Sequence, residues 1–197
     1  MAKKALVFLA DGFEEVEAVT PIDYLRRVGI EVCTASLGAE TLVSGSHGIR
    51  ISADTTLEEL RREGKLEASL WEAVILPGGL PGADNLAASK ECGAFLRGMA
   101  AAGKWVCAIC ASPALVLAPL GLLEGKRFTC YPGMEEKVSG AEWSPERTVV
   151  DKSGSAGAAG LITGRGAGSA GEFAIAIISC LLNEAEGKAL AEKVLLK

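Results

Sequence analysis

The chain contains a single histidine and few aromatic residues, and each scarcity excludes a class of protein. Of its 197 residues one is histidine and 5% are aromatic. With one histidine and one Cys-x-x-Cys pair, the sequence offers no metal-ligand set, so we expect no metal. The low aromatic share, beside 49% hydrophobic residues, favours an aliphatic α/β core in one domain spanning residues 1–197.

Long apolar runs and stripes of positive charge are also missing. No run approaches the length of a transmembrane helix, and the first residues lead into a short strand rather than a signal peptide. The formal net charge is −5 and the basic residues are scattered, so we expect neither a membrane nor a nucleic-acid partner. Six cysteines without the paired spacing of a disulfide framework predict reduced thiols and a cytoplasmic location.

Nucleotide-binding loops are absent as well. The glycine-rich turn Gly164–Gly168 precedes a predicted helix, but no Gly-Lys-Ser/Thr follows it. The Gly-x-Gly-x-x-Gly pattern of dinucleotide-binding folds does not follow the first predicted strand. We therefore expect no cofactor.

Alternating strand and helix signals predict a mostly parallel sheet between helices. Continuous apolar runs predict buried strands at Ala5–Ala10, Ile30–Ser36, Trp71–Leu76 and Trp105–Ile109, with a short strand at Phe128–Tyr131. Helical spacing predicts helices at Glu14–Val28 (kinked or split at Pro21), Thr56–Glu63, Lys90–Ala101, Ser169–Leu182 and Glu186–Leu196. Hairpins are expected within Thr41–Ser52 and between Thr148–Asp151 and Leu161–Thr163, the latter across a flexible linker, Lys152–Gly160.

The junction at Cys110 is the strongest functional signal. A buried strand ends at Ile109, and a helix is expected to open with Ser112 as its N-cap and Pro113 in its first turn. Cys110 therefore lies on a strand–turn–helix bend, the geometry of a nucleophile elbow. Helix N–H dipoles there predict a lowered pKa of the thiol. The alternative is a structural cysteine, since free cysteines are usually buried apolar residues.

The neighbouring Cys107 is expected to be structural. It lies within the strand, so its side chain points into one face of the sheet. The Cys107–Cys110 spacing resembles a thioredoxin redox pair, but such a pair needs both sulfur atoms near the helix start. We therefore do not assign a redox pair.

Glu17 is the second candidate. Three acidic residues, Glu14, Glu15 and Glu17, lie in the first turn of a predicted helix, where the helix dipole alone explains their presence. Glu17, however, follows the first strand at the carboxyl edge of the sheet, where Cys110 also lies, and that edge holds the site in open α/β sheets. Gly78 and Gly79 end another strand and offer N–H groups to an anion, although such a pair is often only a turn.

Four segments together resemble the ThiJ/PfpI superfamily, and within it the branch of the Parkinsonism-associated deglycases and their bacterial relatives. They are Ala5–Val19, Leu76–Gly79, Ala108–Pro113 and Thr163–Gly168, in the family's order and over nearly the whole chain. The resemblance implies a flavodoxin-like three-layer sandwich and a homodimer. It also implies that Cys110 is an oxidation-sensitive nucleophile hydrogen-bonded by Glu17.

The resemblance also implies roles for further residues. It implies that Gly79, with Gly78 beside it, and Ala111 form an oxyanion hole. Arg27 and the turn at 164–169 correspond to residues near the dimer interface and the rim of the site.

Three positions depart from the family pattern. Tyr131 stands where many members have a partner histidine, which also disfavours an amidotransferase. Ala111 stands where the protease branch has histidine, which argues against peptidase activity. His47 stands where an arginine commonly reaches the partner's site, although an exposed loop histidine is the simpler interpretation.

Two classes of function fit a reactive cysteine beside a carboxyl that keeps its proton, for which we expect a raised pKa. In the first, Cys110 attacks a small α-oxoaldehyde such as methylglyoxal, or its adducts, as a glyoxalase or deglycase. In the second, Cys110 is oxidised to a sulfinic acid and the protein is an oxidative-stress sensor or chaperone. The sequence does not separate them.

Overall fold

The computed structural model describes residues 3–153 and 160–196, and within them one sheet of seven strands forms the centre of the molecule. The strand order is β10-β11-β7-β6-β1-β2-β5. Only the edge pair β10–β11 is antiparallel. In chain order the strands are β1 (Lys4–Leu9), β2 (Glu31–Ser36), β5 (Thr55–Thr56), β6 (Ala73–Leu76), β7 (Trp105–Ile109), β10 (Thr148–Asp151) and β11 (Leu161–Gly164). The fold is the predicted flavodoxin-like sandwich.

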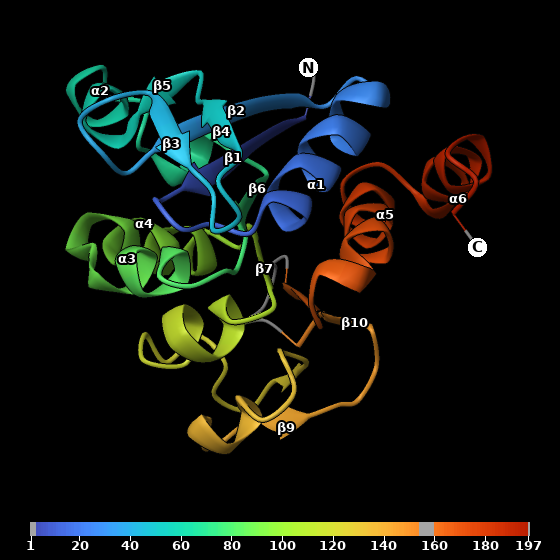
Figure 1. Ribbon diagram of the computed structural model, residues 1–197. Coiled ribbons are helices and arrows are strands. Elements are labelled where there is room, and N and C mark those ends of the chain that lie inside the picture. Colours follow the sequence, from blue (N-terminus) through green and yellow to red (C-terminus); the bar gives the residue numbers. More distant parts are fainter. Residues whose placement is uncertain (1–2, 154–159, 197) are drawn as a thin grey trace.

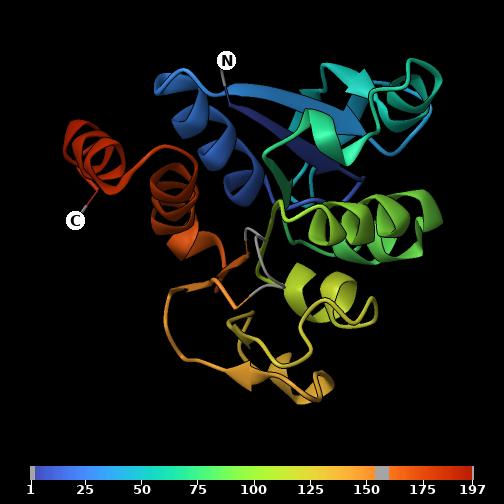
Figure 2. The same ribbon diagram turned by 180° about the vertical axis from the view of Figure 1, so that it is seen from behind.

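Helices cover both faces of the sheet (Figures 1 and 2). One layer holds α1 (Glu15–Arg27), α5 (Ala170–Leu181) and α6 (Glu184–Lys193); the other holds α2 (Leu57–Arg62), α3 (Gly82–Ala88) and α4 (Lys90–Ala101). Short helical turns lie at η1 (Ala68–Leu70), η2 (Pro113–Leu117), η3 (Glu135–Lys137) and η4 (Ala167–Ser169). None of the helices among the described residues is long and apolar enough to span a membrane.

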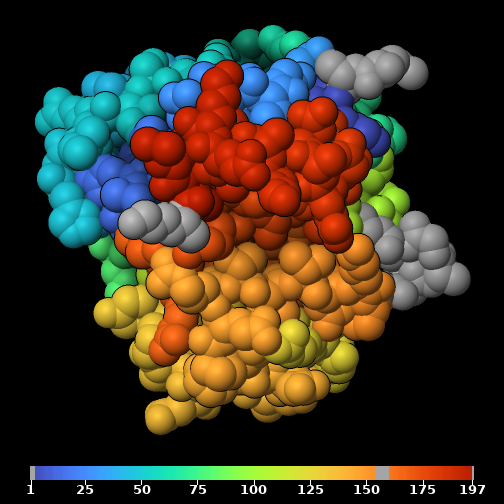
Figure 3. All heavy atoms as spheres, turned by 90° about the vertical axis from the view of Figure 1, so that its right-hand side faces the viewer, coloured from blue at the N-terminus to red at the C-terminus, as the bar shows by residue number. Residues whose placement is uncertain are grey.

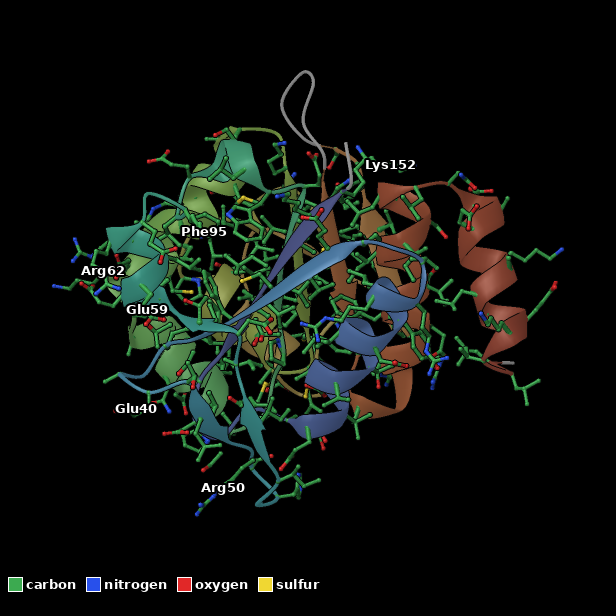
Figure 4. The ribbon with its side chains drawn as sticks, turned by 90° about the horizontal axis from the view of Figure 1, so that it is seen from above. Glu40, Arg50, Glu59, Arg62, Phe95 and Lys152 are labelled. Carbon is green, nitrogen blue, oxygen red and sulfur yellow. The ribbon has the colours of Figure 1, made fainter. Side chains whose placement is uncertain are left out.

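The alternation of side chains along β1 explains why the core has two halves. Ala5, Val7 and Leu9 pack with α1 and α5, whereas Leu6 and Phe8 pack on the side of α4. Successive side chains of a strand point to opposite faces, so a strand covered on both sides must be apolar throughout. The continuous apolar run seen in the sequence is therefore a consequence of the two helix layers, which Figure 4 shows on either side of the strands.

Two small sheets lie outside the central one. The predicted hairpin within Thr41–Ser52 is confirmed as β3 (Leu42–Ser44) and β4 (Arg50–Ser52). Its turn is tied to the start of α1 by a bridge between Phe13 and Gly45, and Figure 4 shows Arg50 pointing outward from it. The other sheet pairs β8 (Arg127–Phe128) with β9 (Glu142–Trp143); this region forms the lower part of the face in Figure 3, below α5 and α6.

Several predicted boundaries were wrong. The strand expected at Phe128–Tyr131 is reduced to Arg127–Phe128, because the chain beyond Phe128 turns toward the elbow, where Tyr131 N–H bonds to Cys110. Helix α3 was not predicted, and α1 is one uninterrupted helix despite Pro21. The second hairpin is confirmed by the pairing of β10 with β11; the linker predicted between them falls largely on residues 154–159, outside the described residues.

Replacing Phe8 with Ala is expected to lower the free energy of unfolding by about 3–5 kcal/mol. Phe8 is fully buried and packs in a T-shaped arrangement with the Phe95 ring, with the ring centroids 5.6 Å apart. Urea denaturation of the variant measures the loss. Leu70→Ala, at a side chain that is 46% exposed, is the control and should change stability by less than about 0.5 kcal/mol. Equal effects of the two substitutions would contradict the assigned core.

Candidate active site at the carboxyl edge of the sheet

The bend predicted at Cys110 is present. Cys110 has a φ of 63°, in the left-handed region that residues other than glycine rarely adopt. Its N–H donates to the Gly164 carbonyl at 2.9 Å, and its carbonyl accepts from the Tyr131 N–H at 2.8 Å. These two bonds hold a backbone conformation that costs about 1–2 kcal/mol. The side chain is thereby raised above the ends of the strands.

The helix after the bend differs from the prediction. Ser112 was expected to be its N-cap, but its φ and ψ of −64° and −35° are already helical, and its side chain caps nothing. The Ser112 hydroxyl instead donates to the Pro77 carbonyl at 2.5 Å. The hydroxyl therefore joins the elbow to the turn after β6, a role that the capping pattern did not suggest.

Gly78 lets the backbone approach both Cys110 and Glu17. A Cβ atom at this position would lie 2.7 Å from Cys110 Cβ and 2.7 Å from Glu17 Oε2. No side chain fits there without displacing one of the two functional groups. The Gly78 N–H donates to Glu17 Oε2 at 2.8 Å, which fixes the carboxyl beside the elbow.

This bond corrects one predicted role. Gly78 was expected to help form the oxyanion hole, but its N–H is directed to Glu17 because the carboxyl lies on that side of the turn. The N–H groups of Gly79 and Ala111 are directed to the Cys110 sulfur, where they favour a negative charge. The geometry therefore leaves two candidate oxyanion donors.

Glu17 is fully buried, and burial raises its pKa to about 7. Interaction with Cys110 and the Gly78 N–H oppose the rise, and Glu14 adds to it. Among the described residues, Oε1 of Glu17 has no hydrogen-bond partner. The raised pKa agrees with the expectation of a carboxyl that keeps its proton near neutral pH.

The expectation of a lowered pKa for Cys110 was wrong. Burial raises the pKa of the thiol, and the charge and hydrogen bonding of Glu17 raise it further. The N–H groups of Gly79 and Ala111 lower it but do not outweigh these effects. Since an ionised Glu17 opposes ionisation of Cys110, the pair loses its two protons in separate steps. Near neutral pH it holds at most one negative charge.

The three predicted rim residues lie in different places. Tyr131 is 52% exposed and is bonded through its N–H to the elbow. Arg27 lies in the last turn of α1, paired with Asp23 at 2.6 Å. About 15 Å of helix separates it from Glu17, because each residue adds 1.5 Å. Arg27 is therefore not on the rim of its own protomer's site, contrary to that expectation.

His47 lies in the turn of the β3–β4 hairpin and pairs with Glu15. Its Nδ1 is 2.9 Å from Glu15 Oε2, and its own N–H donates to Oε1 at 2.7 Å. The hydrogen bonds to His47 and to the Ile49 N–H hold the pKa of Glu15 at about 2 against the effect of burial, and Glu15 raises the pKa of His47. The pair attaches the hairpin to the start of α1.

Glu14, Glu15 and His47 bring potential metal-ligating atoms within 4.8 Å of one another, which the count of histidines did not anticipate. The Glu15 oxygens, however, already accept hydrogen bonds from His47, Ile49 and Ser46. A metal would have to displace these bonds, so we assign none.

The remaining cysteines show no pairing. All six are free. Cys107 is completely buried, and burial raises the pKa of its thiol well above the usual value. It points into the core half that holds α1 and α5. The structure thus agrees with a structural role and with the decision against a Cys107–Cys110 redox pair.

Two arginines that lie beside the site were not identified from the sequence. Arg147 and Arg165 line a pocket of about 300 Å³ together with Tyr131 and Gly166. Arg165 lies within the turn at 164–169 that the resemblance placed near the rim of the site, but the arginine itself was not singled out. A larger pocket of about 560 Å³ lies elsewhere, around Lys4 and other residues at the amino ends of β1 and β2, the edge opposite to the one that holds sites in open α/β sheets.

Comparisons with known proteins identify a family and several relatives of this chain. Residues 3–180 match the DJ-1/PfpI family. Deglycase PH1704 of Pyrococcus horikoshii is 31% identical over 150 residues, which are 75% of this chain and 85% of the relative. The crystal structure of a point mutant of the DJ-1 superfamily protein STM1931 of Salmonella typhimurium has a TM-score of 0.88 at 36% identity, covering 99% of both chains.

A plant relative is much longer than this chain. Protein DJ-1 homolog B of Arabidopsis thaliana is 38% identical over 190 residues, 96% of this chain. Those residues span only 40% of the plant protein. The family thus includes proteins that carry additional sequence beside this domain.

Glu17→Gln is expected to stabilise the protein more at pH 8 than at pH 4. A carboxyl whose pKa rises on folding stabilises the fold below its unfolded pKa of 4.5, and this contribution is lost as the pH rises to about 7. Glutamine does not titrate, so the difference in the gain between the two pH values should be about 3 kcal/mol. Denaturant unfolding at both pH values measures it; an equal gain at both would show that Glu17 titrates normally.

Proposed function

The chain belongs to the DJ-1/PfpI family, and from this premise we propose that it is a cofactor-independent glyoxalase or deglycase acting through Cys110. The single observation that carries the proposal is the left-handed bend that holds the Cys110 sulfur against a buried carboxyl with a pKa of about 7. The substrate is a small α-oxoaldehyde such as methylglyoxal, or an adduct of it. The matched deglycase from Pyrococcus supports the assignment.

The first step is addition to the aldehyde. The Cys110 sulfur forms a bond to the aldehyde carbon, and the carbonyl electrons move onto its oxygen. That charge develops beside the sulfur, within reach of the Gly79 and Ala111 N–H groups, which already point there. Because the pair carries at most one charge, Glu17 holds the proton when the sulfur is ionised.

The second stage moves protons within the hemithioacetal. After giving its proton to the alkoxide, the Glu17 carboxylate removes the proton of the former aldehyde carbon while the ketone oxygen takes up a proton, which leaves an enediol. Glu17 then protonates the former ketone carbon, and the hydroxyl on the first carbon loses its proton as that oxygen becomes a carbonyl, which gives a thioester of a 2-hydroxy acid. Water then cleaves the thioester, releasing the acid and restoring the thiol. Methylglyoxal plus water thus becomes lactate, with no net oxidation or reduction.

Cys110→Ser is expected to abolish lactate production from methylglyoxal, and Glu17→Gln to reduce it by about 10²–10⁴-fold because the proton-transfer group is lost. Cys33→Ser, at a half-buried cysteine of β2, is the control and should retain wild-type turnover. Wild-type kcat/KM should rise as the pH passes about 7, where the pair loses its first proton. Lactate quantified by enzymatic assay or NMR gives the rates.

The alternative is an oxidative-stress sensor, favoured by the same two N–H groups of Gly79 and Ala111. They would hold the oxygens of a sulfinate on Cys110. The absence of lactate production, together with a mass gain of about 32 Da on Cys110 after mild peroxide (two oxygen atoms), would decide for the sensor. Turnover that survives in Cys110→Ser would contradict catalysis by Cys110, and the absence of the mass gain on Cys110 would contradict the sensor.

We further propose that the chain forms a homodimer through the start of α1 and the β3–β4 hairpin. Val16 and Val19 lie on one face of the helix and are 49% and 46% exposed, and Ile49 is 58% exposed. Glu15 ties the Ile49 segment to α1, so these apolar side chains belong to one region. Exposed apolar residues grouped in this way are typical of interaction surfaces. Such a dimer would also bring His47 and Arg27 near the partner.

Val16→Asp is expected to convert the dimer into a monomer, since a charge would be buried at the contact. Size-exclusion chromatography with light scattering, at micromolar concentration, gives the mass. Leu70→Asp, at an equally exposed apolar position away from α1, should leave the dimer intact. A wild-type protein that is monomeric under these conditions would exclude the dimer.

The chemistry also suggests a compartment. All six cysteines are free, and a reactive thiol is preserved only where thiols stay reduced. We therefore propose a cytoplasmic location.

A further inference from the structure

A small pocket adjoins the Cys110 site on the side of the β11–α5 turn. It has a volume of about 300 Å³. Its lining comes from three separate segments: Tyr131 and Pro132, Arg147, and the turn from Arg165 to Ser169. The proposed reaction of a molecule as small as methylglyoxal does not use this space.

The pocket and the elbow share a wall. Tyr131 lines the pocket, and its N–H is bonded to the Cys110 carbonyl. A Cβ atom on Gly166 would lie 3.7 Å from the Tyr131 ring and 4.0 Å from Glu17 Oε1. Gly166 therefore lies between the buried carboxyl and the pocket and places no side chain between them. A group attached to a substrate on Cys110 is able to extend over Gly166 and along Tyr131.

The charge of the pocket is positive because one of its two arginines lacks an acidic partner. Arg147 is paired with Glu172 at 2.6 Å and also donates to the Gly168 carbonyl. The Arg165 guanidinium donates to the Pro145 carbonyl at 2.9 Å, and in the described part of the chain no carboxylate lies within 4 Å of it. Arg165 is only partly exposed. Its charge is thus held beside the site and not neutralised.

We propose that this pocket binds an anionic group, a carboxylate or a phosphate, carried by the substrate, and that Arg165 is the specificity-determining residue. The guanidinium offers a fork of N–H donors that matches either group. The inference rests on the proposed function and narrows its substrate class. The preferred substrates are α-oxoaldehydes or their adducts that bear a negative charge a few bonds from the carbon attacked by Cys110.

The test uses a reaction that does not depend on turnover. Cys110 is alkylated by N-(iodoacetyl)glycine, which is anionic, and by N-(iodoacetyl)glycinamide, its neutral counterpart. In both, the sulfur bonds to the methylene carbon, iodide leaves with its electron pair, and the thiol proton passes to solvent. The ratio of the two rate constants, followed by mass spectrometry of Cys110, isolates the contribution of the charge.

For wild-type Cys110, the ratio of the anionic to the neutral rate constant is expected to be higher by about tenfold or more than the same ratio measured with an uncharged small thiol. Arg165→Gln should remove this preference and Arg165→Lys should restore part of it. Arg97→Gln, at an exposed arginine of α4, should keep the wild-type ratio. An identical ratio in the wild type and in Arg165→Gln would overturn the proposal.

A second measurement separates the two anions. Inorganic phosphate and acetate are each tested for protection of Cys110 against the neutral reagent. Protection by phosphate alone identifies a phosphate site, and protection by acetate a carboxylate site; neither should protect Arg165→Gln. Equal protection of the wild type and Arg165→Gln would contradict the assignment. A protein that prefers the anionic reagent but makes no lactate would support the anion-binding pocket and contradict only the proposed glyoxalase activity.

Discussion

The left-handed backbone at Cys110 is the constraint on which the site depends. A side chain at the end of a parallel strand would normally continue the pleat, but a positive φ turns it above the sheet edge. The bend persists because β11 and the Tyr131 segment hold the peptide groups on both sides of it. Strain of this kind is tolerated only where the surroundings over-determine the conformation. The Ser112–Pro77 bond adds a further constraint from β6.

The second determinant of the site is the single negative charge that Cys110 or Glu17 carries near neutral pH. Both groups are acids and both are buried; burial raises the pKa of each, and Glu17 raises the pKa of Cys110 further. A low-dielectric site cannot hold two negative charges a few ångströms apart without a counter-ion. Gly79 and Ala111 offer N–H groups to the sulfur, and Gly78 offers one to the carboxyl, so either location of the single charge is solvated by backbone. The site is therefore suited to moving a proton between two positions.

Apart from the Glu17 carboxyl, backbone amides supply the polarity near the sulfur, and positive side-chain charge appears only farther away. The Glu15–His47 pair closes one side by holding the hairpin to α1. Arg165 stands on the other side, across Gly166 from Glu17. A centre with at most one negative charge and a cation at its edge is an arrangement that leaves reactivity to Cys110 and selectivity to the outer pocket.

The sequence by itself determined the α/β class, the elbow and the placement of Glu17 and Cys110 at one edge of the sheet, because these follow from local patterns: apolar runs, a strand–Cys–helix junction, and strands that end at one edge. Only the tertiary structure decided that the Cys110 pKa is raised, that Gly78 binds Glu17 rather than an oxyanion, that Arg27 lies away from its own site, and that Arg165 lacks an acidic partner. Each of these depends on burial or on distances between residues far apart in the chain. Electrostatic effects depend on such distances and on the exclusion of water, and neither can be read from the order of residues along the chain.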